Sequence, residues 1–198
     1  MRPFLSTALL SVAMASIAAA AVPPSTLTIV LDFKGPHSDR SVAEMKREFE
    51  NVMKDTGLTF GWWLRGDPEP ESVSHLVLVK FKGKCLLEPV GYLYDERGPL
   101  GVTYTLDGAV QPFAEVACDQ VTATVRSAMF GGDFGRADLL FGRALGRVLA
   151  HEVVHMLARS GSHGKQGVEK PALSGDELIA PDLRLSSADA GRVHLRLP

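Results

Sequence analysis

The spacing of apolar and polar positions in the first part of the chain predicts three strands and one helix. Residues 26–33, 58–64 and 75–81 are short runs rich in β-branched, aromatic and other apolar side chains, which is typical of strands. In residues 38–55 the apolar positions recur at helical spacing, and Gly57 follows as a helix stop. A strand, a helix and a second strand in succession favour a crossover and parallel pairing.

The next part of the chain predicts a hairpin followed by a helix. Residues 101–106 alternate, and the Asp107-Gly108 dipeptide after them is a strong hairpin signal before a returning strand at 111–118. Asp119 can cap a helix over residues 120–129. Because a hairpin adds antiparallel strands to the parallel start, we predict a mixed sheet.

Residues 137–158 form the longest predicted helix, which is apolar on nearly all sides and is therefore expected to be buried. Gly161 is placed to let the chain turn after it, because helices often end with a glycine in the left-handed conformation. A capping box then predicts a short helix at 174–180, and a last helix is expected over about 186–197. The pattern predicts an α+β fold, with a mixed β-sheet packed on one long helix and a small C-terminal helical part.

The first 22 residues have the features of a secretory signal peptide. Arg2 is followed by an uncharged apolar run, then by the small residues Ala19, Ala20 and Ala21 that suit cleavage. We therefore expect residues 1–22 to be removed and the protein to be secreted or periplasmic. An uncleaved N-terminal anchor is the alternative, since the run is near the lower length limit for a membrane span.

Composition fits one globular domain over residues 23–198, with 45% hydrophobic and 22% charged residues. The net charge is −2, and it becomes −3 when removal of the first segment takes away Arg2. A weakly acidic chain without a basic patch argues against nucleic acid as a partner. We also expect no membrane association after signal cleavage, and a monomer.

Cys85 and Cys118 are the only cysteines. An even pair in an exported protein predicts a disulfide, which would stabilise the fold by roughly 3–4 kcal/mol in the chain-entropy model. A zinc site of cysteine and histidine is the alternative, although neither cysteine has metal-like spacing to a partner.

Two arginines, Arg143 and Arg147, precede His151 at four-residue steps on the long helix. Such a stripe is expected to be the solvated edge of a helix. The alternative is a surface that binds an acidic partner near the site.

The long helix carries the sequence His151-Glu152-Val153-Val154-His155. Residues four apart lie on one helix face, so His151 and His155 can place two imidazoles on one metal ion. Glu152 lies near the same face, where it can take a proton from water without binding the metal itself. The simpler interpretation is a pair of buried, hydrogen-bonded histidines.

With His163 following, this HExxH pattern resembles the zinc metallopeptidases of the zincin group. It is most similar to the metzincin-like branch, and in particular to small bacterial proteins that read HExxH, a short apolar run, then His-Gly or His-Ser and a glycine. His163-Gly164 and Gly167 match that pattern. The chain departs from the strict metzincin pattern at Ala158, which stands for a glycine, and His163 comes two residues late. Val168 and Glu169 stand where a methionine is expected. The motif-level similarity covers about residues 137–170.

The resemblance implies a zincin-like fold with an upper part at 23–160 and a lower part at 161–198 that walls a cleft. It implies one Zn²⁺ per chain, with His151, His155 and His163 as ligands and Glu152 as general base. It also implies a peptide or protein substrate, held in extended form on an antiparallel edge strand. The candidate edges are the predicted strands at 101–106 and 111–117.

Several alternatives stay open from the sequence. Glu177 on its short helix is the main rival to His163 as third ligand, and Glu169 is a weaker one. Candidate transition-state donors are Tyr92, Tyr94 and Tyr104, each of which also suits a surface or packing role. The alternative function is a zinc-containing binding or structural domain without turnover.

Overall fold

The computed structural model describes residues 26–70, 73, 75–88 and 98–193. None of the helices in this described part has the length and apolar character that a membrane crossing requires. Outside the described residues lie the predicted signal segment and two of the three candidate donors, residues 1–22, Tyr92 and Tyr94.

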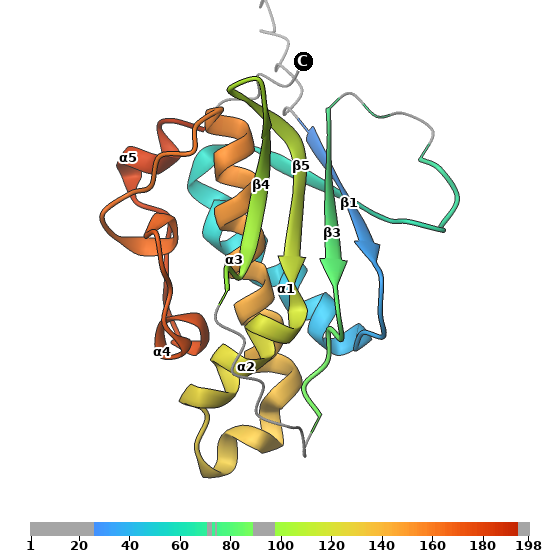
Figure 1. Cartoon of the computed structure of the whole chain (residues 1–198), viewed down its shortest axis with the longest axis vertical. Helices are drawn as coiled ribbons and strands as arrows, with labels where there is room; N and C mark the ends of the chain where they lie inside the picture. The colour runs from blue at the N-terminus through green and yellow to red at the C-terminus, as the bar shows by residue number, and fades with distance from the viewer. Residues whose placement is uncertain (1–25, 71–72, 74, 89–97, 194–198) are drawn as a thin grey trace, which may run out of the picture.

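A five-stranded sheet forms one layer of the fold (Figure 1). Its strand order is β2-β1-β3-β5-β4, and every neighbouring pair is parallel except β5 and β4. The predicted mixed sheet is thus confirmed, and it is mostly parallel. Its strands are β1 (Thr26–Phe33), β2 (Thr59–Leu64), β3 (Leu76–Lys82), β4 (Gly101–Leu106) and β5 (Ala109–Ala117).

The hairpin of β4 and β5 places β4 at the edge of the sheet and β5 inside it. Both turn residues have positive φ, 50° at Asp107 and 78° at Gly108, as a two-residue hairpin of matching twist requires. Of the two predicted edge strands, only the one at 101–106 therefore has an open side within the described sheet.

Helices pack on the sheet and on one another (Figure 1). The last helix is shorter than predicted: it ends at Ala190 instead of continuing toward residue 197, because the N–H groups of Arg192 and Val193 donate to carbonyls three residues back, those of Asp189 and Ala190, and not four. The helices are α1 (Asp39–Met53), α2 (Cys118–Ala128), α3 (Ala137–Ala158), α4 (Gly175–Ile179) and α5 (Ser187–Ala190), with 3₁₀ turns η1 (Lys54–Thr56), η2 (Gly131–Arg136) and η3 (Gly167–Glu169).

Helix α3 packs closely along α1, because two glycines four residues apart face that helix. A Cβ atom at Gly142 would lie 2.5 Å from the Ser41 carbonyl oxygen, and one at Gly146 would lie 2.6 Å from that of Met45. On its other side α3 contacts β4 and β5, so apolar side chains from helices and strands meet in one core. The buried part of α3 thereby holds the motif against the edge of the sheet.

The prediction of a solvated arginine edge on α3 is wrong. Arg147 is 0% exposed; its Nε donates to Glu48 at 2.7 Å. Arg143 is half-buried, and the two guanidinium groups donate to carbonyl oxygens of residues 177–180. The physical reason is that the segment carrying α4 folds over this face, and its terminal carbonyls need donors.

The predicted disulfide between Cys85 and Cys118 is confirmed, with 4.9 Å between the two Cα atoms. It ties the segment after β3 to the start of α2. Because both sulfurs are bonded, the alternative of a cysteine–histidine metal site is excluded.

Candidate metal centre

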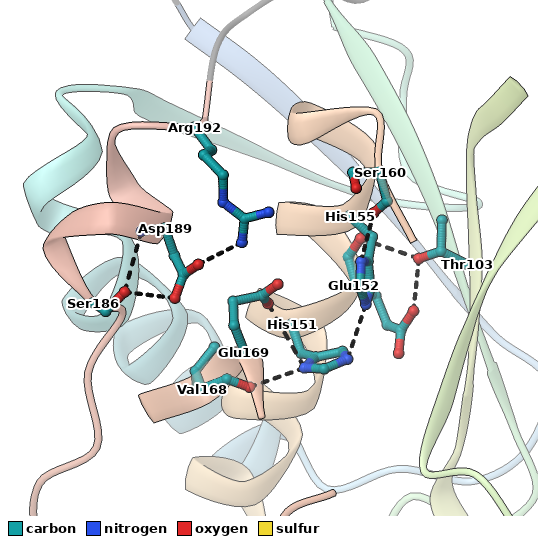
Figure 2. A network of polar contacts seen from close by, with 10 residues as sticks. All are labelled: Thr103, His151, Glu152, His155, Ser160, Val168, Glu169, Ser186, Asp189 and Arg192. Carbon is teal, nitrogen blue, oxygen red and sulfur yellow. Dashed lines mark hydrogen bonds and ion pairs between the residues drawn. The ribbon is translucent and has the colours of Figure 1, made fainter. Parts of the chain in front are cut away.

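The last two turns of α3 present His151, Glu152 and His155 toward the edge strand (Figure 2). The helix ends immediately afterwards at Arg159, whose φ of 50° is left-handed, and Ser160 N–H donates back to the His155 carbonyl at 3.1 Å. The prediction that Gly161 is the left-handed residue is therefore wrong by two positions, because Arg159 has that conformation. The consequence is as expected, because the chain reverses after the helix.

The reversal brings His163 to the other two histidines. The ring centroid of His163 lies 5.2 Å from that of His151 and 4.8 Å from that of His155. One nitrogen from each ring can be chosen so that all three lie within 4.8 Å of one another. His163 is exposed, whereas His155 is buried, so the group opens to solvent on one side. Three histidines in this arrangement are close enough to bind a metal ion.

Backbone carbonyls fix the orientation of the two helical imidazoles. His151 Nδ1 lies 2.9 Å from the Val168 oxygen, and His155 Nδ1 lies 2.7 Å from the Ser160 oxygen. Because a carbonyl can only accept, each Nδ1 carries the hydrogen. Burial lowers the pKa of His151 to about 4 and also lowers the pKa of His155, so both rings are neutral near pH 7.

It follows that both Nε2 atoms bear lone pairs, and these atoms lie 3.0 Å apart. Two lone pairs at this separation repel each other unless a cation lies between them. The tautomers, the burial and the third imidazole together form a ligand set for a metal that accepts nitrogen donors, and zinc is such a metal.

Glu152 is clamped against strand β4 by two residues on the same face of that strand. The Thr103 hydroxyl lies 2.6 Å from one carboxylate oxygen of Glu152 and 3.1 Å from its main-chain oxygen. A Cβ atom at Gly101 would lie only 2.6 Å from the other carboxylate oxygen, so a side chain at this position would push the Glu152 carboxylate away. Burial raises the pKa of Glu152 to about 7, and the Thr103 hydrogen bond acts in the opposite direction.

Beside these groups lies a cavity of about 540 Å³, a size ordinary for a ligand site. The three histidines and Glu152 form one part of its wall, and β4 forms another. The apolar part of its lining includes Leu100, Val102, Val110, Val148, Pro171 and Leu173.

The rival third ligand Glu177 is not part of the histidine group. Its carboxylate completes the capping box with Ser174 and pairs with Lys170 at 2.5 Å. Tyr104 also lies elsewhere, because its hydroxyl donates to Glu115 at 2.8 Å. Neither Glu177 nor Tyr104 lines the cavity.

Glu169, the weaker rival, lies directly beside His151 (Figure 2). One of its carboxylate oxygens is 3.6 Å from His151 Nδ1, on the side of the ring away from Nε2. Burial raises the pKa of Glu169 to about 8, and the nearby Asp189 carboxylate adds to that rise while Arg192 opposes it.

The sequence did not point to Thr103 as a partner of Glu152. Thr103 is a polar position in a strand that alternates apolar and polar residues. On the sequence alone, this alternation indicates only that its side chain lies on the opposite face of the sheet from those of its neighbours in the strand. Comparison with known proteins adds nothing to the residues themselves: no family model matches the chain, and no curated protein is significantly similar to it.

Proposed function

We propose that the protein is a secreted or periplasmic zinc-dependent peptidase. The single observation that carries this proposal is the pair of Nε2 atoms 3.0 Å apart on two rings whose Nδ1 atoms are held by carbonyl oxygens. That arrangement, with His163 as a third imidazole, favours a bound cation. The likeness of the motif to metzincin-like peptidases adds the expectation of zinc.

Zinc suits this site because three neutral imidazoles are a familiar ligand set that leaves one position for water. When bound, zinc would lower the pKa of that water and polarise the scissile carbonyl group. Glu152 would accept the proton of the attacking water and deliver it to the leaving amine. Its raised pKa, near 7, suits a group that both takes up and gives back a proton at neutral pH.

The residues around Glu152 support a role in which it is held in place. Thr103 fixes one of its oxygens and Gly101 leaves room for the other, and both belong to the edge strand β4. A peptide in extended form could pair with the open side of β4, beside the cavity. The Cys85–Cys118 disulfide is compatible with an exported protein.

The test is the variant Glu152→Gln in the full mature chain. Its amide cannot accept a proton but has nearly the same shape, so we expect about one zinc per chain and a loss of cleavage of at least 10²-fold. The matched control is Glu177→Gln, which removes the same charge outside the cavity. Cleavage of a broad peptide library and elemental analysis provide the two measurements.

Each outcome of this test is informative. Wild-type cleavage by Glu152→Gln would show that another group is the base and would overturn the mechanism. Wild-type protein that holds zinc and cleaves no member of the library would favour a zinc-containing binding or structural domain.

A further inference from the structure

Glu169 is a buried carboxylate whose oxygens lack hydrogen-bond partners among the described residues. Its side chain is only 1% exposed. An unpaired carboxylate inside a protein is costly, because it loses its hydration and gains no donor in return. Most buried polar groups are paired, so this exception requires an explanation.

The backbone around Glu169 is fixed, so the burial is not the result of a loose loop. The Glu169 carbonyl accepts from Gly164 N–H at 2.8 Å, and the Val168 N–H donates to Arg184 at 3.0 Å. A Cβ atom at Gly164 would lie 3.0 Å from that of Glu169, so the two residues approach closely on that side. The turn η3 thereby holds Glu169 beside His151.

No charged neighbour among the described residues forms a hydrogen bond with the Glu169 carboxyl group. The nearby guanidinium group of Arg192 donates to Asp189, which also accepts from Ser186 at 2.6 Å (Figure 2). Asp189 is thus occupied, and as a second carboxylate close to Glu169 it adds repulsion. An apolar side chain at position 169 would suit the metal-free fold better.

The side chain of Glu169 faces His151. One carboxylate oxygen lies 3.6 Å from His151 Nδ1, and the carbonyl of the preceding residue, Val168, accepts from the same nitrogen. Glu169 cannot itself share a metal with this imidazole, because it lies on the Nδ1 side and the free lone pair is on Nε2. Carboxylates beside the outer nitrogen of a metal-binding histidine orient the ring and increase its strength as a ligand.

We propose that Glu169 is a positioning residue of the metal centre, whose carboxylate beside His151 Nδ1 raises the affinity of the site for a divalent cation. This inference rests on the metal centre of the proposed function. It assigns the unpaired carboxylate a role that appears only when positive charge is bound, which explains why a group unfavourable to the metal-free fold is present.

The proposal predicts effects of opposite sign on metal binding and on stability. Glu169→Gln, which cannot become negatively charged, and Glu169→Met, which also removes the polarity, should each weaken zinc binding by about 10–100-fold, the range for such outer partners. The same variants should leave the metal-free protein as stable as wild type or more stable, with Glu169→Met showing the larger rise in the urea midpoint. If Glu169 had only a structural role, its replacement would lower the zinc affinity and the urea midpoint together.

The experiment measures zinc affinity by competition with a chromophoric chelator and the urea midpoint of the metal-free protein, on the full mature chain. The matched control is Asp182→Asn, which removes one exposed negative charge from the same C-terminal segment and should change neither quantity. Zinc binding by Glu169→Gln within twofold of wild type would overturn the proposal, and so would a parallel loss of stability and affinity in both variants. Wild-type protein that binds no zinc would overturn the metal centre itself. Zinc binding without cleavage would refute only the peptidase function.

Discussion

Replacement of Arg147 by methionine tests how the C-terminal segment is held on helix α3. The guanidinium group is completely buried, donates to the carboxylate of Glu48 at 2.7 Å and donates to the carbonyl of Glu177 at 2.6 Å. Arg147→Met leaves Glu48, itself 7% exposed, without its partner. Loss of one partner from a buried ion pair costs about 3–5 kcal/mol.

That loss is large beside the total stability of a typical domain, about 5–15 kcal/mol. Urea denaturation of the metal-free, disulfide-bonded protein measures it as a fall in the midpoint at constant slope. The double variant with Glu48→Met should recover part of the loss, because an apolar pair needs no partner. Recovery should be incomplete, because the carbonyl oxygens of Glu177 and Leu178 still lack the donor that Arg147 provided. An unpaired buried acceptor costs about 1–3 kcal/mol.

The control is Arg136→Met, which breaks an exposed pair with Asp133 and should leave the midpoint nearly unchanged. A fall of less than about 1 kcal/mol in Arg147→Met would refute the reasoning, since the buried-pair rule requires several times more. Strict additivity of the Arg147 and Glu48 changes would also refute it, because groups in contact must couple.

Three further predictions concern the site and the disulfide. Thr103→Val should lower kcat about 10-fold or more through loss of a hydrogen bond to a charged group, while Thr103→Ser should stay near wild type in the same peptide assay. Replacement of Cys85 and Cys118 by alanine should cost about 4 kcal/mol in urea denaturation, from a 33-residue separation in the chain-entropy model; an unchanged midpoint would contradict this. His163→Ala should lose zinc affinity while Glu177→Ala keeps it at equal folding by circular dichroism, and the reverse result would make Glu177 the ligand.

Local patterns predicted the elements of this fold because they depend on neighbours in the chain. The alternation in β4, the Asp107-Gly108 turn and the capping box that begins with Ser174 are each set by a few adjacent residues. The chain begins with a strand, a helix and a second strand, an order that favours a crossover connection. Parallel pairing of β1 with β2 was therefore also predictable. The closeness of His151 and His155 is likewise a property of one helix.

Contacts between distant segments were not predictable in this way. Arg147 is buried because a segment thirty residues later folds over it, and nothing in the spacing of α3 indicates that. The turn at Arg159 was placed at Gly161 because glycine favours positive φ, yet the capping hydrogen bonds of the helix fixed the earlier residue. The positions of Thr103 and Glu169 likewise depend on how β4 and η3 pack against α3.

The most direct test of the metal centre is the zinc content of the full chain without the predicted signal segment, residues 1–22, purified without added metal. We expect about one zinc per chain, a thermal midpoint that rises with zinc because the ion binds only the folded state, and loss of both in His151→Ala. Protein that carries no transition metal, and takes up none when titrated with zinc, would contradict the account at its centre.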